Sequence, residues 1–341
     1  MGLGASAPAG IPESARLVVP VLAASGGSGR STVACLLADA LARLGDTVVA
    51  DLSARLCSPW PAWTAGARGG GGLGALPPDR PLSRAEIRDA AAVRQATEGE
   101  WSVLTDGREW STAPLPLPLP ADPAAWYQLA AAGGWQLFVA DTAHPVAHDI
   151  ATARCAGLPG LTRGWCALPY TVPVLCAQPT AGGVQLLHQA VQVLRHCGGV
   201  PWERTVVAFS AASDGALPAV ARAAAATLAP RTAAVVHLPH DPDIRAHGLA
   251  ARPSRIRDRT AEAARPRLGG ARHSPRSLRK PAATGAASRA DPLGGLTRPT
   301  RIGAGGAAIG AASCGVRAWR LVCDRSVTRW RERLVHGPGA G

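Results

Sequence analysis

The residues with the clearest chemical potential lie in one short segment near the start of the chain, Ser25-Gly-Gly-Ser-Gly-Arg-Ser-Thr32. Glycines between a strand and a helix let backbone N–H groups converge on phosphate oxygens, and the helix N-terminus adds a favourable field. The P-loop pattern G-x-x-x-x-G-K-[ST] is not met in full, because Ala24 stands at the first glycine and Arg30 at the lysine. A phosphate-binding loop is therefore predicted, and an ordinary strand-to-helix turn is the alternative.

The sequence around this loop has the pattern of a strand, a turn and a helix. Leu17–Ala23 is a short β-rich run, although Pro20 is unusual inside a central strand. After the loop, apolar residues recur on one helical face as far as Leu44, and Gly45 stands where a helix cap is expected. Further strand candidates alternate with helical segments: Thr47–Ala50, Ser102–Leu104, Leu137–Ala140, Val172–Ala177, Thr205–Phe209 and Ala234–Leu238. This alternation predicts an α/β fold, a mainly parallel sheet flanked by helices on both faces.

Two helix starts carry strong local signals. Ser83 with Glu86 makes a capping box ahead of a helix through Ile87 and Val93, and Asp122 with Pro123 supplies a cap and a first-turn proline. Between these elements, residues 66–78 are expected to form a glycine-rich loop, and residues 114–120 an extended Leu-Pro run.

The glycine loop resembles the deviant phosphate loop, K-G-G-x-G-K-[ST]-[ST], of the ParA/MinD family of ATPases. Five other segments are similar to the family's motifs, in the family's order. Val48–Asp51 looks like its second strand with an acidic end, and Phe138–Thr142 like its Walker B strand. The remaining likenesses are Gly72–Gly74 with Arg80–Leu82, Val174–Thr180, and Val236–Ile244. Together they cover about residues 16–250, so the resemblance implies a P-loop NTPase-like domain over residues 14–250.

The resemblance also implies a ligand and the residues that hold it. It places Mg²⁺ at Ser31 and Asp141 and gives the catalytic roles to Arg30 and Asp51. ATP or ADP is expected at the other matched positions, which are Ser25, Gly26, Gly27, Ser28, Gly29, Arg30, Ser31, Thr32, Pro239 and Asp241. The implied function is that of a regulatory or positioning protein in which nucleotide controls dimerisation and the choice of partner.

Three departures from the family pattern fall at charged catalytic groups. Ser25 occupies the position of the signature lysine, Arg30 replaces the P-loop lysine, and Ser53 stands where relatives carry a second acid after the second strand. A planar guanidinium does not reproduce a compact ammonium, and charge stabilisation is a large part of phosphoryl transfer. Weak or absent ATP hydrolysis is therefore expected, as in a degenerate member. The alternative is a pseudo-ATPase scaffold that binds a protein or membrane partner without nucleotide.

The basic charge is concentrated at the C-terminal end. Residues 1–244 carry a net charge of −2 and residues 245–341 one of +15, which together give +13. We expect a flexible N-terminus over residues 1–13 and a mostly disordered Arg/Pro/Gly-rich tail over 251–341, with a basic amphipathic helix at 316–334. The tail has three interpretations: binding to an anionic membrane, non-specific binding to DNA, or a solvated extension. A shifted reading frame in a GC-rich gene would also produce such a sequence.

The other candidate residues are better explained by structural roles than by metal binding or redox chemistry. His144 and His148 are four residues apart, but no third ligand is evident, so a helix start near Pro145 is favoured over a zinc site. The eight cysteines contain no CxxC pair, and no leader is evident. Together these features predict reduced thiols in a cytoplasmic protein. Association with a membrane or the nucleoid is a further option. Core or partner-surface roles are both open for Trp60, Trp63, Trp126, Trp135, Trp165 and Trp202.

Overall fold

The computed structural model describes residues 16–248, except residues 97, 109–118 and 198. The flexible N-terminus predicted for residues 1–13, the tail over 251–341 with its helix at 316–334, and most of the extended run at 114–120 lie outside the described residues. None of the helices in the described part has the length and apolar character needed to cross a membrane.

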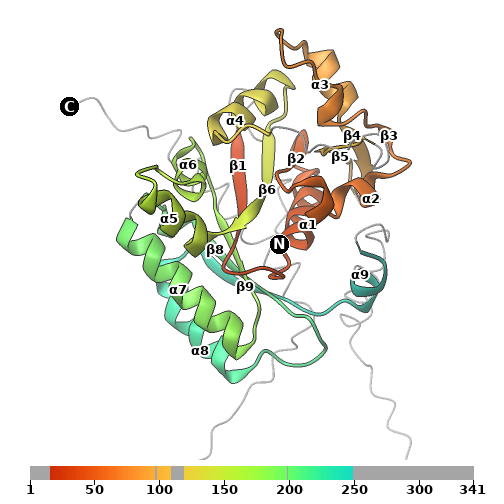
Figure 1. Cartoon of the computed structure of the whole chain (residues 1–341). Coiled ribbons are helices and arrows are strands. Elements are labelled where there is room, and N and C mark those ends of the chain that lie inside the picture. Colours follow the sequence, from red (N-terminus) through yellow and green to blue (C-terminus); the bar gives the residue numbers. More distant parts are fainter. Residues whose placement is uncertain (1–15, 97, 109–118, 198, 249–341) are drawn as a thin grey trace, which may run out of the picture.

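A nine-stranded sheet forms the centre of the molecule (Figure 1). Its strands lie in the order β3-β4-β5-β2-β6-β1-β7-β8-β9, and all neighbours from β5 to β9 in this order are parallel. Near one edge, β4 pairs antiparallel with both β3 and β5, so β4 alone among the described strands runs against the direction of the others. The strand bounds are β1 Leu17–Ala23, β2 Thr47–Asp51, β3 Arg68–Gly69, β4 Ala92–Gln95, β5 Glu100–Leu104, β6 Leu137–Pro145, β7 Val174–Ala177, β8 Val206–Ser210 and β9 Ala234–Leu238.

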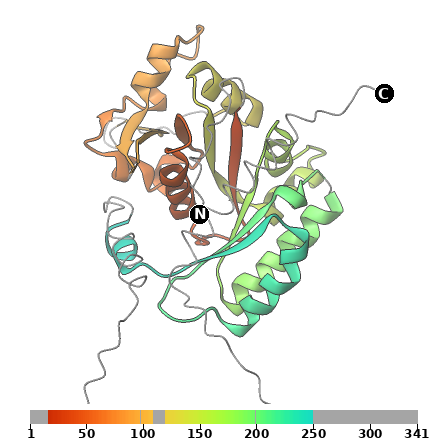
Figure 2. The same ribbon diagram turned by 180° about the vertical axis from the view of Figure 1, so that it is seen from behind.

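Helices cover both faces of this sheet, as predicted. The bounds of the helices are α1 Arg30–Leu41, α2 Trp60–Thr64, α3 Arg84–Ala90, α4 Pro123–Ala132, α5 Val146–Cys155, α6 Leu161–Ala167, α7 Ala181–Cys197, α8 Ala219–Leu228 and α9 Pro242–His247, with 3-10 turns at Arg55–Cys57, Leu73–Ala75, Trp202–Arg204 and Ala229–Arg231. Helices α7 and α8 pack together, and α9 lies on the opposite side of β8 and β9 (Figures 1 and 2). The prediction of a mainly parallel α/β sheet with two covered faces is confirmed.

The core follows from the two-residue period of the strands. In β1, Leu17, Val19 and Val21 pack in a cluster with α1, whereas Val18 and Leu22 belong to the clusters on the opposite face. Trp60, Trp126, Trp135 and Trp165 are buried, and Trp63 and Trp202 are partly buried against the same clusters. The tryptophans named in the sequence are therefore core residues.

Pro20 is accommodated in β1 because its missing N–H falls in a gap of the ladder. On the β7 side, β1 is joined at an isolated bridge between Val18 and Thr171 and pairs again only from Val21 opposite Val174. The gap also explains why β7 begins at Val174, two residues later than the sequence predicts.

The boundaries of α1 and α3 correct two expectations. Helix α1 ends at Leu41 rather than Leu44, and Gly45 is not in the left-handed region that a helix-capping glycine adopts. The capping box of Ser83 and Glu86 is present, but α3 ends at Ala90 and Val93 lies in β4, antiparallel to β5. A short apolar run fits either a helix or a strand, so only pairing with β5 decides it.

Candidate functional site

The glycine segment forms the turn between β1 and the first residue of α1. Gly27 and Gly29 have φ angles of 69° and 80°, a region in which side chains with a Cβ are strained. The amide of Gln178 donates to the Gly27 carbonyl at 2.9 Å, so the loop after β7 supports the turn. Gly29 is the N-cap of α1, which leaves the first N–H groups of that helix without a side-chain cap.

We expect Gly29→Ala to destabilise the fold by about 1–2 kcal/mol from its left-handed backbone alone. A Cβ at this position would also lie 2.8 Å from the Cβ and Oγ atoms of Ser210, so the end of β8 would have to shift. Gly26→Ala is the matched control, because a Cβ there has no atom within 4 Å and the residue does not have a positive φ. Urea unfolding of both variants measures the difference, and equal stabilities would contradict this account of the turn.

Arg30 is turned toward the interior of the site. Its Nε lies 3.8 Å from Oδ1 of Asp141, and a terminal nitrogen donates to the His144 carbonyl at 3.2 Å. Asp141 is in the long strand β6, and it pairs with Asp51 of the adjacent strand β2. The first turn of α1 and the middle of β6 therefore bring Arg30 and Asp141 together.

Asp141 is a fully buried carboxylate with one oxygen bonded and the other not. Its Oδ2 accepts a hydrogen bond of 2.7 Å from the Trp60 indole, whereas Oδ1 has no hydrogen-bond partner among the residues that the structure describes. Burial raises the pKa of Asp141, and the side chains of Ser31, Trp60 and Arg30 act to lower it. A buried anionic oxygen beside a serine hydroxyl fits the hard oxygen chemistry of Mg²⁺, so Ser31 and Asp141 are suited to hold it.

Asp51 lies at the end of β2, and its oxygens are occupied by nearby donors. Ser58 and Thr105 each donate to Oδ2 at 2.6 Å, and the backbone N–H of Ser53 donates to Oδ1 at 3.1 Å. Burial raises the pKa of Asp51 to about 6, against the lowering effect of these hydrogen bonds. The carboxyl group therefore fastens the segment after β2 and the end of β5 to the sheet.

The other predicted ligand positions surround the same edge of the sheet at different depths. Ser28 is buried, and its hydroxyl has no hydrogen-bond partner among the described residues, while Ser25, Ser31 and Thr32 are partly exposed. Parallel strands place their carboxyl ends on one edge, which is where such sheets bind ligands. The segment with Pro239 and Asp241 follows β9 at this edge.

Asp241 has a structural role that the sequence did not specify. Its Oδ1 accepts from the backbone N–H groups of Asp243 and Ile244, so it caps α9. Arg245 of this helix donates to the Ala212 carbonyl at 3.0 Å, which ties α9 to the loop after β8. Within the described part of the chain, no hydrogen bond or ion pair joins this segment to the glycine turn.

His144 contacts Thr162 rather than His148. Its Nε2 lies 3.0 Å from the Thr162 hydroxyl, and burial lowers its pKa. His148 is exposed, and α5 begins at Val146, next to Pro145, as the sequence predicts. Within the described residues, no three His, Cys, Asp or Glu side chains are grouped closely enough to hold a metal ion.

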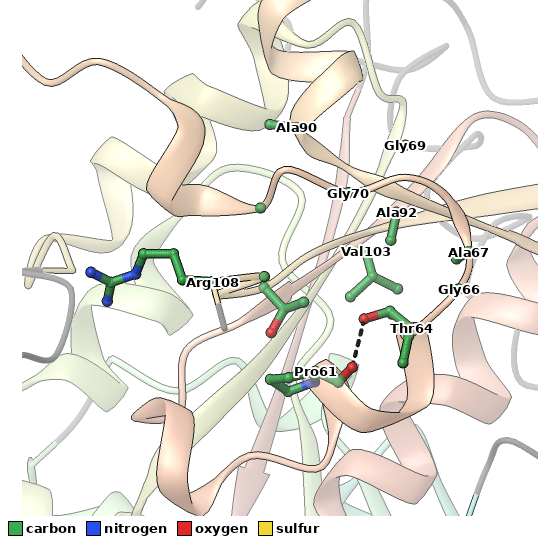
Figure 3. A pocket seen from close by; sticks show the side chains of 14 residues that line it. Pro61, Thr64, Gly66, Ala67, Gly69, Gly70, Ala90, Ala92, Val103 and Arg108 are labelled. Atoms are coloured by element: carbon green, nitrogen blue, oxygen red, sulfur yellow. Dashed lines mark hydrogen bonds between the residues drawn. The ribbon is translucent and has the colours of Figure 1, made fainter. Parts of the chain in front are cut away.

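A cavity of about 280 Å³ lies between α2, the glycine-rich segment around β3 and the end of β5 (Figure 3). No residue of the glycine turn lines it. Small side chains and backbone form most of its wall, and the Arg108 side chain extends away from Thr64 (Figure 3). Thr64 donates to the carbonyls of Trp60 and Pro61, and Arg108 pairs with Asp106. The cavity thus shares α2 with the Asp141 site but contains none of the predicted ligand residues.

Sequence reasoning missed several residues that contact the site. Trp60, Ser58 and Thr105 bond to its carboxylates, and Gln178 and Ser210 lie against the glycine turn. Only Gln178 falls in a segment that the motif comparison had marked. The others come from segments far apart in the sequence and carry no spacing signal.

Solved structures with a similar fold are found at low sequence identity, whereas no protein-family model and no curated protein matches the chain. A ParA family ATPase from Chlorobium tepidum TLS is 14% identical, covers 72% of this chain and 93% of its own, and has a TM-score of 0.47. Apo McdA from Cyanothece is 13% identical with a TM-score of 0.44, covering 71% and 93%. A chain of the MinC:MinD cell division protein complex from Aquifex aeolicus is 13% identical, covers 73% of this chain and 92% of its own, and has a TM-score of 0.46.

The elements on which the sequence resemblance depends occupy corresponding places in the structure. The glycine turn joins β1 to α1, β6 lies beside β1 and carries Asp141, and the segments after β7 and β9 lie at the same edge of the sheet. This arrangement agrees with the fold that the resemblance implies, a mainly parallel α/β sheet with a glycine turn between its first strand and its first helix.

Proposed function

We propose that this chain is a nucleotide-binding, ParA/MinD-like regulatory or positioning protein in which ATP or ADP with Mg²⁺ controls dimerisation and partner choice. The observation that carries the proposal is the turn before α1, where Gly27 and Gly29 have left-handed backbones and the first helical N–H groups have no side-chain cap. Such a turn offers several N–H donors and the positive end of a helix to a phosphate.

The metal side of the proposed site is supplied by Ser31 and Asp141. Ser31 follows the turn directly, and the unbonded Oδ1 of Asp141 is a buried acceptor beside Arg30. Bound Mg²⁺ would neutralise phosphate charge. The guanidinium of Arg30, which now faces Asp141, would add a second positive charge beside the phosphate.

Weak or absent hydrolysis is part of the proposal. Ser25 replaces the signature lysine, and the side chain of Arg30 is directed toward Asp141 and the His144 carbonyl. The acceptors of Asp51 are taken up by Ser58 and Thr105 and by a backbone N–H group, so this carboxylate is poorly placed to accept a proton from an attacking water.

A thermal-unfolding titration of the full chain with ATP, ADP and GTP, with and without Mg²⁺, tests the proposal. A Mg²⁺-dependent stabilisation by adenine nucleotides is expected, of about 2.7 kcal/mol at a concentration of 100 Kd. Arg30→Ala should remove this stabilisation. Its matched control is Arg68→Ala, because the side chain of Arg68 is 75% exposed and, among the described residues, pairs with Glu100 alone. No stabilisation by any nucleotide would overturn the proposal.

The second candidate is a pseudo-ATPase scaffold that binds a protein or membrane partner without nucleotide. It is favoured by the engagement of Arg30 with Asp141 and with the His144 carbonyl, because this arrangement satisfies part of the site's charge internally. The scaffold predicts the same unfolding temperature in all nucleotide conditions, so the titration above separates the two candidates.

The partners and the place of action are also proposals. A homodimer is expected from the family resemblance, and sedimentation with and without Mg²⁺-ATP measures it. For the basic tail, we propose an anionic membrane or non-specific DNA as its partner, which would place a cytoplasmic protein at a membrane or nucleoid. Binding of the full chain and of a chain lacking residues 251–341 to anionic vesicles and to duplex DNA distinguishes these partners, and equal binding by both chains would remove the tail's role.

A further inference from the structure

Trp60 contacts the carboxylate of Asp141 at the proposed nucleotide site. Its side chain is fully buried, and its indole N–H donates to Oδ2 of Asp141 at 2.7 Å. Its ring packs edge-on against Trp63, with ring centres 5.3 Å apart, and against Trp101, with ring centres 6.0 Å apart. The indole is therefore held by aromatic packing and cannot turn away from Asp141 without disturbing that cluster.

The hydrogen bond fixes the orientation of the carboxylate. Because Oδ2 is bonded to Trp60, Oδ1 is the oxygen that faces Arg30, at 3.8 Å from its Nε. That oxygen has no hydrogen-bond partner among the described residues, so it is the acceptor left for a ligand. An outer partner that orients a metal-site ligand in this way commonly changes metal affinity when it is removed.

The start of α2 is anchored from the other side by Asp51. Ser58 donates to Oδ2 of Asp51 at 2.6 Å, and its hydroxyl oxygen accepts from the backbone N–H of Trp60 at 3.1 Å. A continuous path of hydrogen bonds thus runs from the end of β2 through Ser58 and Trp60 to Asp141 in β6. Through these hydrogen bonds, the segment between β2 and α2 is connected to the carboxylate proposed to hold Mg²⁺.

We infer that Trp60 is a positioning residue for Asp141, which keeps one carboxylate oxygen turned toward the phosphate loop for Mg²⁺ with nucleotide. The inference rests on the proposed nucleotide function and deepens it. It also assigns Ser58 and Asp51 the role of fixing Trp60, instead of a role at the reacting phosphate.

Trp60→Phe tests the inference, because it keeps an aromatic ring in the cluster and removes the indole donor, together with a loss of ring volume that the control variant shares. Trp101→Phe is the matched control, since Trp101 is buried in the same cluster and its indole N–H has no hydrogen-bond partner among the described residues. At a fixed concentration of ATP, the Mg²⁺ concentration that gives half of the thermal stabilisation should rise about tenfold or more in Trp60→Phe. It should change little in Trp101→Phe. Equal midpoints in all three proteins, or equal shifts in both variants, would overturn the inference.

A second measurement does not depend on nucleotide. In ¹⁵N-labelled full-length protein without ligand, each variant identifies one indole resonance by its loss. The indole proton of Trp60 should lie downfield of that of Trp101, because only the former is bonded to a carboxylate. Coincident shifts would overturn the contact with Asp141. A downfield Trp60 proton in a protein that no nucleotide stabilises would instead support the contact and overturn the proposed function.

Discussion

Replacing Arg30 by alanine is expected to abolish the nucleotide-dependent stabilisation and to weaken the unliganded fold by about 3 kcal/mol. The first effect, about 2.7 kcal/mol at 100 Kd, follows if the guanidinium contacts phosphate. The second follows because Asp141 is fully buried and Arg30 is its ion-pair partner, so the substitution leaves an uncompensated buried charge. Urea unfolding without ligand and thermal unfolding with Mg²⁺-ATP measure the two effects separately.

Arg30→Lys distinguishes charge from geometry at the same position. Lysine keeps the positive charge but lacks the planar fork that reaches both Asp141 and the His144 carbonyl. We expect it to recover part of the nucleotide response, since a lysine occupies this position in the P-loop pattern. Full stabilisation by Mg²⁺-ATP in Arg30→Ala would show that this residue does not hold phosphate, and would move the positive charge of the site elsewhere.

Asp51→Asn is expected to gain about 3 kcal/mol of unfolding free energy relative to the wild type between pH 4 and pH 7, because it removes one component of the pH dependence. Burial raises the pKa of Asp51 to about 6 from an ordinary value of 3.8, so the fold favours the protonated form. The cost of ionising this group in the fold is absent below pH 4, grows between about pH 4 and pH 6, and is constant above. At 1.36 kcal/mol for each pKa unit, that cost is about 3 kcal/mol at pH 7.

The difference in unfolding free energy between Asp51→Asn and the wild type, measured in urea from pH 4 to pH 7.5, checks this expectation. The variant should gain on the wild type as pH rises to about 6, and the difference should then stay constant. Asp79→Asn, at an exposed position, controls for the removal of one acidic charge. A difference for Asp51→Asn that does not vary with pH would contradict the raised pKa.

The elements of this fold were predictable because their signals are local. The apolar, β-rich run at Leu17–Ala23, the glycine turn and the capping pairs at Ser83 and Asp122 each depend on a few consecutive residues, and the structure has the corresponding elements. The short edge strands β3 and β4 were not predictable, because the antiparallel pairing of Val93 depends on a partner nine residues further along.

The sequence by itself determined the α/β class, the glycine turn between β1 and α1, and the presence of acidic residues at the end of β2 and within β6. It could not determine what those acids contact. Asp51 meets Ser58 and Thr105, and Asp141 meets Trp60, across separations of up to 81 residues. Hydrogen-bond partners of this kind are chosen by how the strands are ordered and how the tryptophans pack. Periodicity and capping describe neighbours in the chain, so only the tertiary structure could turn Asp51 into an anchor and make Trp60 the partner of Asp141.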